Sequence, residues 1–140
     1  MMLDVAYTVE PQLAVDEFID VLVRSTLGQR RPIAHRQTME GMLRHADVII
    51  AARKNGRLIG VSRAITDFSY CTYLSDLAVD SACQRQGIGR RLIEETHAAA
   101  GRHTTLILLS APAAMTYYPH IGLQPHPSCW TIPGQLPATE

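Results

Sequence analysis

A predicted strand, a glycine-bearing turn and a helix follow one another in Tyr73–Gly101, and this stretch constrains the fold most. Its first part, Tyr73–Val79, is mostly apolar or favours β-structure, which predicts a buried strand. The turn Gln84–Gly89 (QRQGIG) follows. From Ile88 on, the positions of the apolar face are spaced four, four and three residues apart, which predicts an amphipathic helix that ends at Gly101. Its predicted inner face consists of Ile88, Leu92, Thr96 and Ala99.

The chemistry of this turn suits a phosphate or pyrophosphate group. A helix N-terminus leaves backbone N–H groups without partners, and the helix dipole adds partial positive charge there. Gly87 and Gly89 let the backbone approach a ligand closely, since they carry no Cβ. Arg85, Arg90 and Arg91 add positive charge nearby. A tight turn that binds nothing is the alternative for two glycines alone.

A dinucleotide-binding fingerprint would also place glycines before a helix. It requires a third Gly or Ala three residues after the second Gly, where this chain has Leu92. It also requires an acidic residue about 20 positions further on. The sequence around position 109 is Leu-Leu-Ser, so both requirements fail.

The turn resembles the Q/R-x-x-G-x-G/A motif of the GNAT superfamily, the acyl-CoA-dependent N-acetyltransferases. The matching positions are Gln84, Gly87 and Gly89, with Leu77-Ala78-Val79-Asp80 just upstream. The resemblance implies that the turn binds the pyrophosphate of acetyl-CoA and that the strand before it pairs with the pantetheine arm through a bulge. The implied cofactor-binding residues are Leu77, Ala78, Val79, Gln84, Arg85, Gln86, Gly87, Ile88, Gly89 and Arg90.

A second family motif, A-x-x-F-Y-x-x-x-G-F, resembles Ala113–Leu123 in spacing. By this resemblance Tyr118 is the general acid that meets the departing coenzyme A sulfur. Proton transfer from a phenol to a thiolate is uphill by about 2 kcal/mol in water. A charge-assisted hydrogen bond to the developing thiolate still stabilises it. The alternative is a tyrosine packed by its ring with its hydroxyl at the surface.

Acetyl transfer also needs an oxyanion donor and a route for the amine proton. The N–H of Val79 is the candidate oxyanion donor. Asp76 is the candidate base, because a carboxylate in an apolar strand is partly desolvated, which raises its pKa. Three alternatives stay open: Asp76 is a satisfied strand-end carboxylate, it binds the substrate ammonium, or a water chain removes the proton.

The rest of the chain predicts a mixed α/β sheet. Lys54-Asn55-Gly56-Arg57 between two strand-like runs predicts a β-hairpin. The order matches the GNAT-like acyl-CoA N-acyltransferase fold, with six to seven strands and about four helices on both faces. Helices are expected in Val15–Gly28, in His35–Leu43 and just after Pro112. Strands are expected at Val5–Val9, Val48–Arg53, Leu58–Ile65, Tyr70–Val79 and Thr104–Ser110, and more weakly at Ile121–Leu123 and Cys129–Ile132.

Composition restricts the function classes further. The 140 residues suit a single N-acetyltransferase domain, 1–140. Lys+Arg and Asp+Glu both number 13, which argues against broad nucleic-acid or membrane binding. Three cysteines, no secretory leader and no long apolar run predict a cytoplasmic protein with reduced thiols. The six histidines show no metal-ligand spacing, so no metal is expected.

The sequence therefore predicts an N-acetyltransferase that moves an acetyl group from acetyl-CoA to a primary amine by direct transfer in a ternary complex. The acceptor is a small molecule or a peptide amine, and the resemblance implies a possible homodimer. One alternative is a non-catalytic acyl-CoA-sensing or protein-binding module of the same fold, and another is a nucleotide-binding regulatory domain. The pair Arg30-Arg31, between the first two helices, is either solvated or binds an acidic acceptor group.

Overall fold

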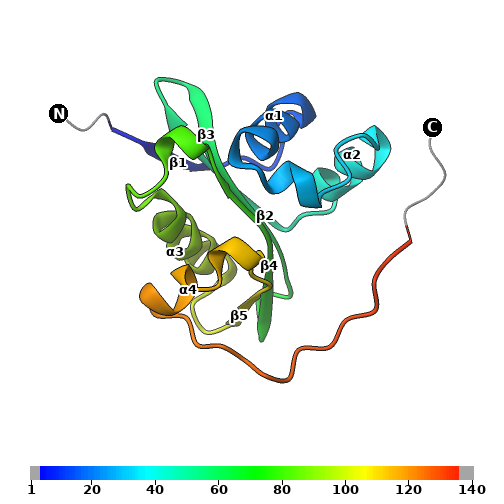
Figure 1. The fold of residues 1–140 in the computed structure, drawn as a ribbon, viewed down its shortest axis with the longest axis vertical. Helices are drawn as coiled ribbons and strands as arrows, with labels where there is room; N and C mark the ends of the chain where they lie inside the picture. The colour runs from blue at the N-terminus through cyan, green and yellow to red at the C-terminus, as the bar shows by residue number, and fades with distance from the viewer. Residues whose placement is uncertain (1–3, 136–140) are drawn as a thin grey trace. The chain divides into compact units, whose positions relative to one another are not determined.

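The computed structural model describes residues 4–135. The chain forms two compact units, residues 1–108 and 109–140, and each is described by itself. The described residues of the first unit form one five-stranded sheet and three α-helices (Figure 1). The strands are β1 (Ala6–Val9), β2 (Val48–Lys54), β3 (Arg57–Thr66), β4 (Cys71–Val79) and β5 (Thr105–Leu108). The helices are α1 (Val15–Ser25), α2 (Arg36–Arg44) and α3 (Ile88–Ala100).

The strands lie side by side in chain order, β1 to β5. The first four are antiparallel neighbours, whereas β5 is parallel to β4 because α3 connects them as a crossover. Figure 1 shows α1 and α2 on one face of the sheet and α3 on the other. The predicted class, a mixed α/β sheet with helices on both faces, is confirmed.

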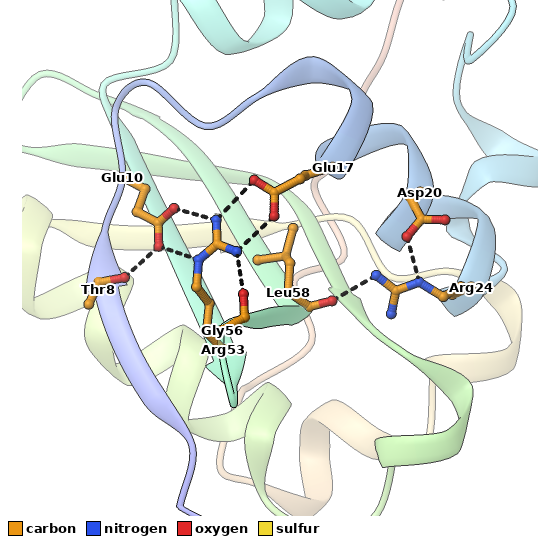
Figure 2. Close-up of polar contacts among 8 residues, drawn as sticks. All are labelled: Thr8, Glu10, Glu17, Asp20, Arg24, Arg53, Gly56 and Leu58. Carbon is orange, nitrogen blue, oxygen red and sulfur yellow. Dashed lines mark hydrogen bonds and ion pairs between the residues drawn. The ribbon is translucent and has the colours of Figure 1, made fainter.

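The predicted hairpin between β2 and β3 is also confirmed. Lys54 pairs with Arg57, so the connection is a two-residue turn. Asn55 and Gly56 both have positive φ, 52° and 79°, as a hairpin turn of type I′ requires. Arg53, at the end of β2, binds Glu10 and Glu17 at 2.7 Å each (Figure 2). These ion pairs connect the hairpin to the segment before α1 and to α1 itself.

Each face of the sheet buries a different helical surface. Between the sheet and α1 and α2 lies a core that includes Phe18, Val21, Leu22, Met39, Leu43, Ile49, Val61 and Ala78. On the other face, α3 buries Ile88, Leu92, Ile93, Thr96 and Ala100. The prediction that Ala99 belongs to this inner face was wrong, because Ala99 is exposed. The buried row continues in steps of four from Leu92 to Thr96 and Ala100.

The second unit holds a 3₁₀ turn at Pro112–Ala114 and the short helix α4 (Tyr117–His120). The two weaker strand predictions, Ile121–Leu123 and Cys129–Ile132, were wrong, since neither segment forms a strand. Residues 4–135 therefore contain five strands rather than six or seven. In the second segment Trp130 and Ile132 are almost fully exposed, so their side chains have no neighbouring strand to pack against.

A close contact between β3 and α3 depends on Gly60. A Cβ at this position would lie 3.1 Å from Leu92 Cδ1 and 3.3 Å from the Ile88 side chain. We therefore expect Gly60→Val to lower the free energy of unfolding by about 1–3 kcal/mol through overpacking. Urea denaturation measures this change. The control is Gly41→Ala, because a Cβ there meets nothing within 4 Å. A Gly60→Val protein as stable as wild type would contradict the contact.

Candidate functional site

Half of β4 has a free edge. Its first part, Cys71–Leu74, pairs with Thr105–Leu108 of β5. Beyond Leu74, β4 pairs with β3 and with no other strand of the described residues. Backbone groups on the outer side of Ser75–Val79 therefore have no partner strand, although Ser75 O accepts from Arg31 and Val79 O accepts from Gln84. Such an edge can take up a ligand as an additional strand.

The direction of these groups follows from the ladder with β3. Asp80 N–H donates to Ile59 O at 2.8 Å, so Asp80 faces β3. Along an antiparallel pair the hydrogen-bonding residues alternate. Two predicted ligand-binding residues, Leu77 and Val79, therefore direct their N–H and C=O groups to the free edge, whereas Ala78 directs its own to β3. The Gln84 side-chain amide donates to Val79 O at 3.2 Å, which brings two predicted site residues together.

The predicted phosphate turn connects this edge to α3. Arg85 and Gly87 adopt the left-handed conformation, with φ 64° and 83°, and Gly87 is the N-cap of α3. Arg91 N–H makes the first helical hydrogen bond, to Gly87 O at 3.1 Å. The amides of Ile88, Gly89 and Arg90 thus have no acceptor within the helix. A Cβ at Gly87 would meet no atom within 4 Å, so the space in front of the turn is open.

Two predicted members of the turn belong to the helix. Ile88 and Gly89 are the first residues of α3, and the Ile88 side chain is buried. Only the backbone of Ile88 can therefore contact a ligand. Gln84, Arg85, Gln86 and Arg90 are exposed, and Arg90 Nε lies 3.2 Å from Glu94 Oε1.

An ion pair that the sequence analysis missed holds the start of the turn. Arg24 of α1 binds Asp80 Oδ2 at 2.5 Å and Leu58 O at 2.7 Å. Figure 2 shows the Arg24 contacts to Asp20 and Leu58. Asp80 Oδ1 accepts from the N–H of Ala82. This backbone hydrogen bond and Arg24 together hold the pKa of Asp80 below its usual range, against the desolvation that would raise it.

Asp76 lies within β4, not at its end, and it is fully buried. Its Oδ1 accepts from Arg31 Nε at 2.5 Å, and its Oδ2 accepts from Arg63 Nε. Both oxygens of the candidate base are therefore bound by guanidinium groups. Arg31 is accordingly not a solvated loop residue. A charged residue inside the apolar run of β3 was the signal for Arg63, because a buried charge requires a partner.

Tyr118 lies on α4, in the second unit. Its side chain is half-buried, and its ring makes an edge-to-face contact with Tyr117 at 5.3 Å between centroids. Burial, with a smaller contribution from Tyr117, raises the pKa of Tyr118 above its ordinary value of about 10. Leu123 N–H donates to Tyr118 O at 3.0 Å and closes the turn after α4.

Residues 4–135 hold no group of three or more His, Cys, Asp or Glu side chains arranged for a metal ion. Among the same residues, no helix combines the length and apolar character that crossing a membrane requires. Cys71, Cys83 and Cys129 are free thiols.

The family model of the acetyltransferase (GNAT) domain matches residues 25–128, about three quarters of the chain. This match spans the free edge of β4, the turn before α3 and the Tyr118 segment. The chain belongs to the GNAT acetyltransferase family. No curated protein matches it significantly in sequence.

Solved structures show the same fold at low sequence identity. A GNAT-family acetyltransferase from Streptococcus pneumoniae superposes with a TM-score of 0.77 at 18% identity, over 95% of this chain and 98% of that one. A probable acetyltransferase from methicillin-resistant Staphylococcus aureus superposes with a TM-score of 0.74 at 19% identity, over 96% of this chain and 100% of that one. An aminoglycoside N-acetyltransferase in complex with coenzyme A gives 0.72 at 15% identity, over 97% and 98%.

The pair Arg24–Asp80 predicts an acid-dependent stability. Because the folded pKa of Asp80 is depressed, its stabilisation is present above the unfolded value of about 3.9 and is lost as pH falls through the folded value. We expect Asp80→Asn to cost about 1–2 kcal/mol at pH 7, and the difference from wild type to shrink below about pH 4. Urea denaturation at several pH values measures both.

The matched control is Asp20→Asn, which removes the exposed partner of the same arginine. An exposed ion pair contributes less than about 1 kcal/mol, so this variant should resemble wild type. If the two variants lost the same free energy of unfolding at pH 7, the ion pair of Asp80 would contribute no more than the exposed pair of Asp20.

Proposed function

We propose that this protein is an N-acetyltransferase that moves an acetyl group from acetyl-CoA to a primary amine by direct transfer in a ternary complex. One observation carries the proposal. The free edge of β4 leads, within about ten residues, into a helix N-terminus whose amides have no intrahelical acceptor. An extended arm that ends in a pyrophosphate matches this succession. One structural neighbour, an aminoglycoside N-acetyltransferase in complex with coenzyme A, supports it.

The proposed binding divides between backbone and side chains. The amides of Gly87–Arg90 bind the pyrophosphate, with the α3 dipole and the exposed Arg85 adding positive charge. The N–H and C=O groups of Leu77 and the C=O of Val79 pair with the pantetheine arm, which leaves the Val79 N–H for the thioester carbonyl. The Gln84 side chain already donates to Val79 O at 3.2 Å, so in this proposal it shares that oxygen with the arm or releases it.

In the proposed reaction the amine nitrogen attacks the thioester carbonyl carbon. The N–H of Val79 donates to the carbonyl oxygen as it becomes an oxyanion, which is worth about 10²–10³ in rate for a well-placed donor. The C–S bond then breaks, and the sulfur takes up a proton or a strong hydrogen bond from Tyr118. The amine proton leaves to water.

Asp76 is less suited to receive that proton than the sequence suggested. Both of its oxygens already accept hydrogen bonds from arginines, and its side chain is fully buried. The arrangement supports the alternative in which Asp76 is a satisfied carboxylate and water removes the proton. The catalytic role of Asp76 remains a prediction.

Binding at the turn is tested by Gly87→Glu. We expect it to abolish coenzyme A binding measured by calorimetry, because a carboxylate would occupy the open space in front of the amides. The matched control is Gly56→Glu in the β2–β3 turn, where φ is 79° and a Cβ also meets nothing within 4 Å. It has the same backbone strain but should keep wild-type affinity. Unchanged affinity in Gly87→Glu would refute the site.

The role of Tyr118 is tested by Tyr118→Phe. We expect kcat to fall by about 10²-fold or more, with little change in acetyl-CoA binding, since only the hydroxyl is lost. Because burial raises the pKa of Tyr118, the alkaline decline of kcat that depends on Tyr118 should lie at higher pH than an ordinary tyrosine would give. Wild-type kcat in Tyr118→Phe would remove Tyr118 from the mechanism.

A non-catalytic acyl-CoA-sensing module is the second candidate. The engaged oxygens of Asp76 favour it, because they leave no obvious side-chain base on β4. A screen of acetyl-CoA consumption over small amines, amino acids, polyamines and peptide amines separates the two functions. Transfer to any amine supports the enzyme, whereas tight coenzyme A binding with slow acceptor-independent hydrolysis alone supports the sensor.

A further inference from the structure

An extra residue in β4 determines which backbone groups reach its free edge. Arg63 pairs with Asp76 but Ala64 pairs with Leu74, so Ser75 has no partner on β3 and forms a β-bulge. The bulge lies where pairing with β5 ends, at Leu74.

The bulge reverses the alternation of the strand. Thr105 N–H donates to Tyr70 O at 2.8 Å. Tyr70 and every second residue up to Leu74 therefore direct their backbone N–H and C=O groups to β5. Without the extra residue, the same alternation would direct the groups of Ala78 to the free edge and those of Val79 to β3. A shift by one residue exchanges the two sides of a strand. The proposed oxyanion donor is therefore available only because of Ser75.

Arg31 holds this bulge from the segment before α2. It follows the 3₁₀ turn Leu27–Arg30, and its side chain is 22% exposed. Its Nε donates to Asp76 Oδ1 at 2.5 Å, and its Nη2 donates to Ser75 O at 2.8 Å. One rigid guanidinium thus binds two successive residues at the bulge.

Arg63 holds the same two residues from β3. Its Nε donates to Asp76 Oδ2, and its Nη2 donates to Ser75 Oγ at 2.9 Å. Arg63 is 6% exposed and Asp76 is fully buried. Within this Arg31–Asp76–Arg63 cluster, the two arginines therefore bind both carboxylate oxygens of Asp76 and both oxygens of Ser75.

We propose that Arg31, Asp76 and Arg63 are positioning residues for acetyl transfer. They hold the Ser75 bulge in place, and the bulge directs the Val79 N–H to the thioester. This inference rests on the proposed function, in which that amide stabilises the oxyanion. It assigns Asp76 a role through geometry and charge, and none as a base.

Arg31→Ala is the most informative variant, because it leaves a matched pair of Asp76 and Arg63 and removes only a partly exposed side chain. Asp76→Asn leaves two guanidinium groups without a carboxylate and is expected to be less stable. The control is Arg36→Ala, which also removes an ion-paired arginine, but one that binds Asp16 and Glu40 at the surface of α2.

The primary readout is amide hydrogen exchange, followed by NMR on the full chain. In Arg31→Ala, we expect the amides of Asp76 and Ala78, which face β3, to exchange at least about tenfold faster. Thr96, buried in α3, should not change. With acetyl-CoA and the best amine of the screen, kcat should fall about 10- to 100-fold. Coenzyme A affinity should change less than kcat, because the turn before α3 is intact. Arg36→Ala should match wild type in every readout.

Unchanged exchange or unchanged kcat in Arg31→Ala overturns the inference. A wild-type protein that binds no coenzyme A refutes the proposed function instead, and the exchange experiment still tests the cluster. A double variant of Arg31→Ala and Asp76→Asn should lose little more activity than either single variant. The pH profile of kcat/KM tests whether Asp76 instead acts as the general base. If Asp76→Asn loses the fall of kcat/KM at acidic pH and Arg31→Ala keeps it, the inference is also overturned.

Discussion

The strand β4 has two neighbours along its first half and one along its second, and the rest of the structure follows from this asymmetry. Pairing with β5 stops at Leu74, the extra residue Ser75 follows at once, and the remaining backbone groups face an open edge. The crossover helix α3 starts at the end of the same strand, after a short turn. The free edge and the N-terminus of α3 are therefore joined by one short segment of the chain, residues 80–87.

Much of this arrangement could be predicted from local patterns. The pair Asn55-Gly56 determines the β2–β3 hairpin because both positions need positive φ. The spacing of Leu92 and Thr96 predicts which side of α3 packs on the sheet. The glycine before α3 indicates a turn that a ligand can approach closely. These features depend on residues near one another in the chain, so a single sequence contains the information.

Other parts depend on contacts between distant residues, and the sequence did not predict them. Asp76 looked like a carboxylate in an apolar strand, and nothing nearby in the sequence reveals that Arg31 and Arg63 bind it. Arg24 and Asp80 are 56 positions apart. The segments after α4 were predicted as strands from their apolar residues, but Trp130 and Ile132 are 91% and 98% exposed. Apolar residues form a strand only where a neighbouring strand pairs with them.

The charges at the bulge also restrict how β3 and β4 can align while the chain folds. Arg63 and Asp76 are direct cross-strand partners, and both are buried. If β4 slipped by one residue, the carboxylate would leave its guanidinium partners, and Arg63 would remain buried without a counter-charge. An apolar pair at these positions would tolerate such a slip at far lower cost. The pair thus disfavours misaligned pairing of β3 and β4, and this effect does not depend on any substrate.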